Sequence, residues 1–409
     1  MKLNIIKELL DINNCDFEIV ERKGRGHPDT LSDKLAELLS RTYSKYTLEK
    51  YDVVLRHQFD KLSLMGGKCE VRFGGGNFKF PIRLLINGRT TNKFDNEVID
   101  SKELLINTAS KFLEKELRNF NFSTDCRVIW ENTSNSTRGM IDNKNKGDSA
   151  IHNRFHPRSM KDLPEATRPI SNDTAVGCAW APFTKLERMI LNIEKTLTSD
   201  EMWKKYPWMG SDCKIMGSRY KNEVDLTISI PQLSTQVHSV NEYKTNYNIT
   251  LTLINKIIKD KYDFKEVEIT LNPGDNTDKE MLYLRLTGSC IESGDEGQVS
   301  RGNRLGGIIS SRRPFSIEGL SGKNPLYHAG KIYSAASWDI VNKIYKQQNI
   351  PCEVYIASQI DRPVDDPWTV VVNSVKEIDK EKTGRIIKDV LYNISEVTER
   401  LINGEYPLV

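Results

Sequence analysis

The sequence has no long hydrophobic run, no strong excess of either charge and no paired-cysteine motif. No apolar stretch approaches the length of a membrane span, and the first residues lack the apolar core of a signal peptide. The net charge is +3 with both signs interspersed, so composition gives no indication of nucleic-acid binding. The seven cysteines are scattered without a Cys-x-x-Cys pair, which argues against structural disulfides or a zinc site. These absences favour a cytoplasmic protein without nucleic-acid or membrane partners.

The chain is too long for one ordinary core. It has 409 residues, 38% hydrophobic and 28% charged, which indicates a folded protein of two or three lobes at roughly 100–200 residues each. Strand pairs followed by one long helix recur about three times, which predicts α+β lobes with helices on one face of each sheet. The expected helices are about 30–50, 101–118, 186–197, 240–260 and 381–402. The expected strands are 53–55, 62–65, 81–86, 224–230, 266–271, 282–287, 353–358 and 368–373.

The stretch 131–162 differs from the rest in composition. It is rich in Asn, Ser, Lys, Arg and His, and it shows neither a helical nor a strand period. We expect a long surface excursion there, either an ordered lid or a loop. His152 and His156 are four residues apart within it, but they have no carboxylate or cysteine company, so they are a weak indication of a metal pair.

The most informative feature is the run Val-Glu-Arg-Lys-Gly-Arg-Gly-His-Pro-Asp-Thr at 20–30. A helix begins directly after it, and a helix N-terminus carries unpaired N–H groups that attract anions such as phosphate. His27 and Asp29 therefore lie where a phosphorylated ligand could meet a proton donor and a metal ligand. The alternative is a helix capped by Asp29 or Thr30, with an exposed histidine beside it.

Four further segments indicate a ligand-binding site only when they are considered together. Segment 293–304 holds acidic residues and two arginines among glycines, a mixture suited to a magnesium-bound triphosphate. Segment 312–331 gathers arginines, lysines and a histidine without the spacing of a Walker A loop. Segment 170–177 offers Asn, Asp and Thr groups for a ribose, base or amino-acid head group, although alone it is a turn signal. The glycines at 66–76 could approach a ligand, but alone they favour a hairpin.

Ordered across nearly the whole chain, these motifs resemble those of the archaeal-type S-adenosylmethionine synthetases (methionine adenosyltransferases). The resemblance rests on the 20–29 run, the glycines of 66–76, Asn-Asp-Thr at 172–174 with Ala-Pro at 181–182, and Asp-x-Lys-x-Met-Gly at 212–217. It continues through Gly-Asp-x-Gly-x-Val at 294–299, Arg-Gly-Asn-Arg at 301–304 and Ser-Gly-Lys-Asn-Pro-x-x-His-x-Gly-Lys-Ile-Tyr at 321–333. Residue 300 is serine where the family usually has glycine.

The resemblance implies three similar α+β lobes related by pseudo-threefold symmetry, and a homodimer with active sites between subunits. We expect interleaved lobes at about 1–125, 126–275 (with the 131–162 insertion) and 276–409. The implied reaction joins methionine to ATP, giving S-adenosylmethionine, and cleaves the triphosphate to pyrophosphate and phosphate. The implied cofactor is magnesium, with potassium as a second candidate. Two other functions stay open: a non-catalytic nucleotide-binding paralogue or regulatory subunit, and a triphosphate hydrolase.

The resemblance also implies roles for individual residues. His27 would face the departing O5′ oxygen of ATP, and Arg301 and Lys323 would act with it in catalysis. The other candidates fall into three groups. The expected ATP and phosphate contacts are Asp29, Asp173, Arg304, Arg313, Lys323, His328 and Lys331. The expected contacts of methionine or adenosine are Asp60, Asn172, Asp212 and Lys214. The expected metal ligands are Asp29 and Asp295.

Overall fold

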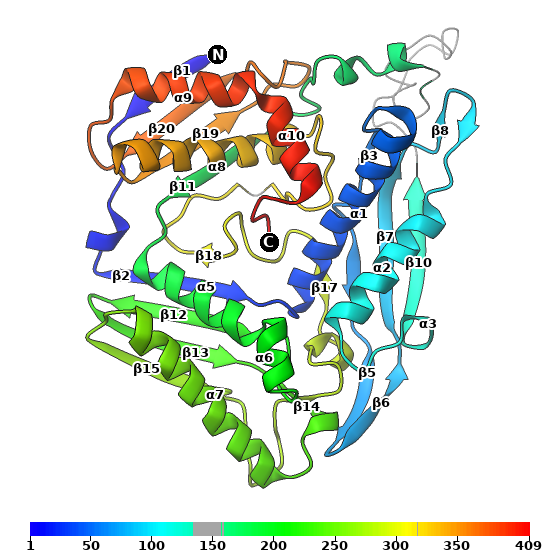
Figure 1. The fold of residues 1–409 in the computed structure, drawn as a ribbon, viewed down its shortest axis with the longest axis vertical. Coiled ribbons are helices and arrows are strands. Elements are labelled where there is room, and N and C mark those ends of the chain that lie inside the picture. The colour runs from blue at the N-terminus through cyan, green and yellow to red at the C-terminus, as the bar shows by residue number, and fades with distance from the viewer. Residues whose placement is uncertain (134–156, 158, 317) are drawn as a thin grey trace.

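The structure, a computed structural model, describes residues 1–133, 157, 159–316 and 318–409. Within these ranges the chain forms a mixed α/β fold with three larger sheets, each carrying helices on one face (Figure 1). No helix in these ranges is long and apolar enough to cross a membrane. The smaller sheets pair β5 (Lys68–Arg72) with β6 (Gly75–Phe80), β8 (Lys93–Phe94) with β9 (Glu97–Val98), and β14 (Gln232–Leu233) with β16 (Leu284–Arg285).

The first larger sheet carries helices α1 (Pro28–Tyr51) and α2 (Lys102–Glu116). Leu31 and Leu35 of α1 pack in one core with Leu84 of the central strand, because apolar residues spaced three and four apart share a helix face. Its strand order is β10–β7–β4–β17, with β3 paired to β7. These elements are β3 (His57–Gln58), β4 (Ser63–Met65), β7 (Ile82–Thr90), β10 (Cys126–Thr133), preceded by the short α3 (Phe122–Asp125), and β17 (Gly297–Gln298).

The second larger sheet has the order β15–β13–β12–β2–β18 and carries α5 and α7 (Figure 1). Along β12 and β13, buried and exposed residues alternate, as expected where one sheet face is covered and the other is open. The elements are β2 (Phe17–Lys23), α5 (Lys185–Leu197), α6 (Asp200–Lys205), β12 (Lys214–Tyr220), β13 (Glu223–Ser229), α7 (Val240–Lys261), β15 (Glu266–Leu271) and β18 (Ile309–Ser310).

The third larger sheet joins the two ends of the chain. Its order is β1–β20–β19–β11, and β1 runs parallel to β20 with Lys2 opposite Thr369. Figure 1 shows α8 and α9 over this sheet and α10 beside them. The elements are β1 (Lys2–Ile6), β11 (Val176–Ala181), α8 (Ala329–Gln348), β19 (Cys352–Ala357), β20 (Thr369–Ser374), α9 (Lys380–Tyr392) and α10 (Ile394–Asn403). Short 3₁₀ turns occupy Ile12–Asn14, Met160–Asp162, Pro164–Ala166, Ser234–Gln236 and Cys290–Ser293.

Most elements with a clear period are confirmed. The helices expected at about 30–50, 101–118, 186–197 and 240–260 are α1, α2, α5 and α7, and the strand expected at 266–271 is β15. The hairpin at 66–76 is also present, as β5 and β6. The helix expected over 381–402 is split, because α9 ends at Tyr392 and α10 begins at Ile394.

Two expectations are wrong. Residues 53–55 are not a strand but part of the irregular segment between α1 and β3, and the strand expected at 282–287 is only the two residues of β16. One long helix, α8, was not expected. Every residue from Ala329 to Ser337 is buried, so the sequence shows no polar face and no helical period there.

The division at 1–125, 126–275 and 276–409 stays a prediction. Each larger sheet takes strands from more than one of these ranges; β10, for example, pairs with β7 across the first boundary. Within the expected insertion at 131–162, residues 134–156 and 158 lie outside the described residues, and so do His152 and His156.

Candidate active site

His27 caps the N-terminus of α1. Its Nδ1 accepts a hydrogen bond from the Asp29 backbone N–H at 3.2 Å, so the neutral ring carries its proton on Nε2 and can donate from there. The pKa of His27 is lowered to about 4, chiefly by burial; the charges of Lys23 and Lys214 act in the same direction, and those of Asp29 and Asp295 oppose it. At neutral pH the ring is therefore an uncharged hydrogen-bond donor.

Asp29 connects three segments of the chain. One carboxylate oxygen accepts from Lys23 Nζ at 2.8 Å, and the other accepts from the Gln298 backbone N–H at 3.0 Å. Lys23 also donates to the Arg301 carbonyl at 2.7 Å. A Cβ on Gly297 would lie 2.0 Å from the Pro28 carbonyl oxygen, so only glycine lets β17 lie this close to the start of α1. The acidic and arginine-bearing loop is thus held against His27.

One turn further along α1, Asp33 holds the same loop. Its carboxylate accepts from the Ser300 backbone N–H at 2.8 Å, and burial raises the pKa of Asp33 to about 7. Ser300 has a φ of 72°, a left-handed angle usually taken by glycine. Arg304 donates to the Ser300 carbonyl at 2.9 Å, whereas the Arg301 side chain is exposed. Arg301 is therefore accessible to a ligand.

Four of the expected residues line one cavity of about 680 Å³: His27, Asp212, Lys214 and Asp295. Asp212 is buried, accepts from the Cys290 backbone N–H at 2.9 Å, and has a pKa raised to about 7 chiefly by burial. Lys214 is partly exposed and pairs with Glu21 at 3.2 Å. The other lining residues are mostly polar: Ser229, Asn272, Gly274, Asp275, Glu280, Met281, Leu282, Tyr283, Arg285 and Cys290. The cavity offers both polar groups and an apolar patch to a small molecule.

A second group of expected residues surrounds Lys323. Its ammonium pairs with Glu318 and lies 3.8 Å from the Asp60 carboxylate, and burial lowers its pKa to about 8. His328 is buried with Nε2 3.9 Å from Glu318, and its Nδ1 has no hydrogen-bond partner among the described residues. Burial and the charge of Lys323 lower the pKa of His328, so it is neutral. The exposed Asp173 also acts on this group by raising the pKa of Lys323.

Lys331 supports the turn that carries Lys323 from the buried side. It is fully buried, and its ammonium lies 2.7 and 2.8 Å from the two Glu37 oxygens and 2.8 Å from the Lys323 carbonyl. Glu37 also accepts from the Gly322 N–H at 3.0 Å. In this structure Lys331 therefore positions the turn rather than facing open space.

Arg313 and Asn172 make internal contacts of their own. Arg313 forms a two-pronged pair with Glu187 of α5, with both N–O distances at 2.7 Å, and donates to the Pro182 carbonyl. Asn172 accepts from the Ala329 N–H at 3.3 Å, at the start of α8. The structure does not bring Arg313 into either group, whereas Asn172 lies beside the segment that carries His328.

Some functional candidates escaped the sequence reasoning. Asp29, Asp33 and Glu37 repeat every four residues along α1, and this spacing places three carboxylates on one helix face. The spacing itself therefore indicates Asp33 and Glu37, which are not among the expected site residues. Lys23 and Glu318 carried no such signal, because each depends on contacts between distant segments.

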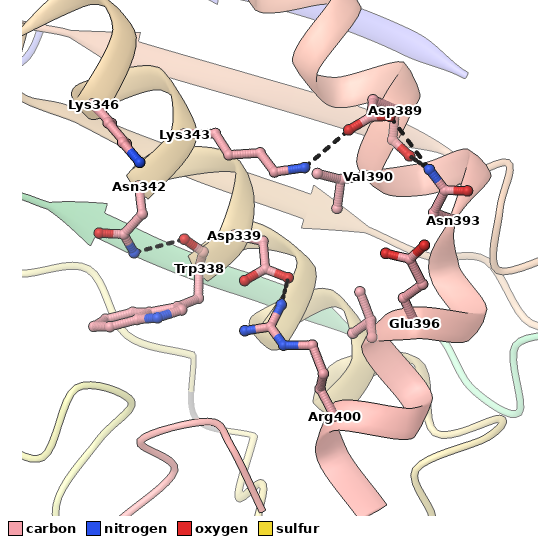
Figure 2. A pocket seen from close by; sticks show the side chains of 11 residues that line it. Trp338, Asp339, Asn342, Lys343, Lys346, Asp389, Val390, Asn393, Glu396 and Arg400 are labelled. Atoms are coloured by element: carbon pink, nitrogen blue, oxygen red, sulfur yellow. Dashed lines mark hydrogen bonds and ion pairs between the residues drawn. The ribbon is translucent and has the colours of Figure 1, made fainter. Parts of the chain in front are cut away.

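A separate groove lies on the helical side of the third sheet. Figure 2 shows Lys343 of α8 reaching Asp389 of α9, and Arg400 of α10 reaching Asp339. These ion pairs measure 2.9 and 2.7 Å. The groove holds none of the expected site residues, and its central charges neutralise one another.

Comparison with known proteins gives a consistent result. The model of the S-adenosylmethionine synthetase (AdoMet synthetase) family matches residues 4–405. The chain is 34% identical to the S-adenosylmethionine synthase of Thermoplasma acidophilum, over 96% of this chain and 95% of that protein. It is also 34% identical to the S-adenosylmethionine synthase of Picrophilus torridus, over 95% and 94%. The synthase of Saccharolobus islandicus is similarly 34% identical, over 98% of both chains.

Proposed function

Because the chain belongs to the S-adenosylmethionine synthetase family, it makes S-adenosylmethionine from methionine and ATP, and we propose that the His27 cavity houses this reaction. The observation that carries the proposal is the joining of His27, Asp212, Lys214 and Asp295 in one cavity. A family match over residues 4–405 supports it. The paralogue and hydrolase alternatives are not favoured, because the relatives are named as synthases throughout.

The chemistry suits a neutral histidine. The methionine sulfur forms a bond to C5′ of ATP while the C5′–O5′ bond breaks, and the triphosphate leaves with the bonding electrons. The sulfur has no proton to lose, so the reaction needs no general base; alignment and stabilisation of the departing oxygen lower the barrier. We propose that His27 donates from Nε2 to that oxygen, while Asp212 and Lys214 orient methionine or adenosine.

We propose that the basic residues hold the triphosphate and assist its cleavage to pyrophosphate and phosphate. Arg301 is exposed beside Asp29, and Lys323 and the neutral His328 lie on either side of the Glu318 carboxylate. Arg304 supports the first group. The proposed substrate contacts around the second group are Asp60, Asn172 and Asp173. We propose that Arg313 and Lys331 act on the triphosphate indirectly. Each holds in place the loop that carries it or a neighbouring phosphate-binding residue.

Magnesium is the cofactor that we propose, with Asp29 and Asp295 as its protein ligands. Both carboxylates act on His27, and Mg²⁺ is held by one or two carboxylates with phosphate oxygens and water rather than by an all-protein cage. That preference suits the described part of the chain, where no three His, Cys, Asp or Glu side chains form a metal cluster. When bound, the ion would neutralise charge on the triphosphate. Potassium is a second candidate.

We also propose a homodimer with active sites between subunits, built from three similar lobes with pseudo-threefold symmetry. Each of the three larger sheets carries helices on one face, which supports the symmetry. The open face of the second sheet carries four exposed apolar side chains on adjacent strands, which supports an interface. These are Phe17, Ile19, Met216 and Tyr220. All seven cysteines are free, which supports the proposed cytoplasmic location.

A product assay tests the proposed function. The purified protein is incubated with methionine, ATP and magnesium, with and without potassium, and S-adenosylmethionine is quantified by mass spectrometry. We expect product only when methionine and the divalent metal are both present. ATP binding without product would indicate the paralogue, and methionine-independent triphosphate cleavage would indicate the hydrolase.

A further inference from the structure

A cavity of about 580 Å³ lies between α1, α2 and the C-terminal segment after α10. Figure 1 shows this segment ending between α10 and α1. The cavity shares no lining residue with the His27 cavity. Leu38, Phe112 and Leu408 give it an apolar wall, and its volume suits a small organic molecule.

Basic side chains dominate the polar part of this wall. Lys34, Arg41, Lys111 and Lys115 all line the cavity, against two glutamates. Both glutamates are already neutralised from elsewhere. Glu37 is held by Lys331, and Glu116 forms a two-pronged pair with Arg25 at 2.7 and 3.1 Å. The cavity therefore has an excess of positive charge.

Lys34 is the unusual member of this set. It makes no hydrogen bond or ion pair with any residue in the described ranges, although its side chain is only partly exposed; burial lowers its pKa, and the charges of Glu116 and Glu194 oppose that shift. An ammonium that is partly removed from water without a direct ion-pair partner costs free energy, and that cost falls when an anion enters beside it. Arg41 is different, because it donates to the Ile402 and Asn403 carbonyls at 3.0 and 2.7 Å and so fixes the wall.

The groove of Figure 2 provides the contrast. There, Lys343 and Arg400 each have a carboxylate partner of their own, so the groove does not require an anion. In the cavity beside α1, the unpaired lysine sits next to an apolar wall. An anion with an apolar body satisfies both features at once.

We propose that this cavity binds a small amphiphilic organic anion, with a carboxylate or phosphate group beside Lys34 and an apolar body against Phe112 and Leu38. Lys34 follows directly after Asp33 on α1 and Glu37 lies one turn further along, so this ligand would lie close to the loops that α1 holds. Glu37, which lines the cavity, also binds Lys331 and the Gly322 N–H beside Lys323.

The test uses 8-anilinonaphthalene-1-sulfonate as the probe, an apolar aromatic anion whose fluorescence rises on binding. We expect one saturable site per chain, and Lys34→Met should weaken binding at least tenfold. Lys45→Met removes the same charge from an exposed position of the same helix and should leave the affinity within twofold. Equal affinity in Lys34→Met and the unchanged protein overturns the proposal.

A second variant and two competing ligands serve as controls. They distinguish loss of the site from misfolding and from binding in the His27 cavity. Thr108→Trp keeps Lys34 but fills the cavity from α2, and it should also weaken the probe at least tenfold. Octanoate should displace the probe, whereas a non-hydrolysable ATP analogue with magnesium should not. Displacement by the ATP analogue would place the probe in the substrate site and overturn the assignment.

Discussion

At the residue scale, the protonation state of each histidine follows from its surroundings. His27 and His57 both have pKa values well below the ordinary value of about 6.5, the first about 4 and the second about 3, and burial is the main cause in each. His27 faces a cavity, whereas His57 is enclosed by Ser40 Oγ at 2.8 Å and the Leu55 carbonyl at 2.9 Å. Both imidazole rings are therefore neutral, but His27 is available to a ligand in the cavity, whereas His57 is part of the packed interior.

Replacing His27 should separate catalysis from binding. We expect His27→Ala to lower kcat by about 10²–10³-fold, as for loss of a donor to a developing oxyanion, while ATP affinity changes less than about threefold. Single-turnover product formation and equilibrium ATP binding measure the two quantities. The exposed His238→Ala variant is the control. Equal losses in rate and affinity would contradict the proposed role.

His57 makes stability depend on pH. Between pH 6.5 and 3 the unfolded chain binds a proton that the folded ring does not, so the free energy of unfolding falls as pH decreases through this window, by about 1.4 kcal/mol per unit. We expect His57→Gln to reduce that slope by about 1.4 kcal/mol per pH unit, which is the contribution of one proton. Urea unfolding at a series of pH values measures it, with His238→Gln as the control. An unchanged slope would show that His57 is protonated in the folded state.

At the element scale, α1 organises the site. Asp29, Asp33 and Glu37 project from successive turns and hold the 298–304 loop and the 322–323 turn. The sequence predicted α1 because its leucines repeat at helical spacing, and it predicted His27 and Asp29 because a helix start is a local signal. It could not predict that Arg313 would form an ion pair with Glu187 and Lys331 with Glu37, since those partners come from other segments.

The close approach of β17 to α1 predicts a sharp effect of one methyl group. Gly297→Ala should lower the free energy of unfolding by about 1–3 kcal/mol, because its Cβ would overlap the Pro28 carbonyl. Activity should fall with it, since Gln298 binds Asp29. Gly384→Ala, in α9 with no atom within 4 Å of the added Cβ, should instead raise stability by about 0.5–1 kcal/mol. Thermal unfolding of both variants makes the comparison; equal effects would refute it.

At the scale of the whole molecule, sheets are assembled from distant segments. The alternation along β13 and β15 predicted strands, but no local pattern indicated that β2 would lie between β12 and β18. Long-range pairing of this kind is decided by packing and not by propensity. For the same reason the sequence predicted individual strands, whereas it did not predict which strands share a sheet.

The open face of the second sheet leads to a prediction about assembly. Ile19→Asp should convert the proposed dimer to a monomer and lower activity at least tenfold, because a charge on the apolar face opposes burial. Sedimentation velocity gives the mass, and circular dichroism checks folding. Tyr392→Asp, on the helical surface where that side chain is 87% exposed, should change neither property. A folded, fully active monomer would contradict the proposed interface.

The pairing of β1 with β20 has a consequence for protein synthesis. Residues 2–6 leave the ribosome long before their partner strand, residues 369–374. At a translation speed of about 5–20 residues per second, the first strand waits on the order of 20–70 seconds for that partner. During this interval a nascent apolar segment has an unsatisfied edge, which is the kind of segment that chaperones bind. The third sheet is thus completed only after every strand of the other two larger sheets has been synthesised.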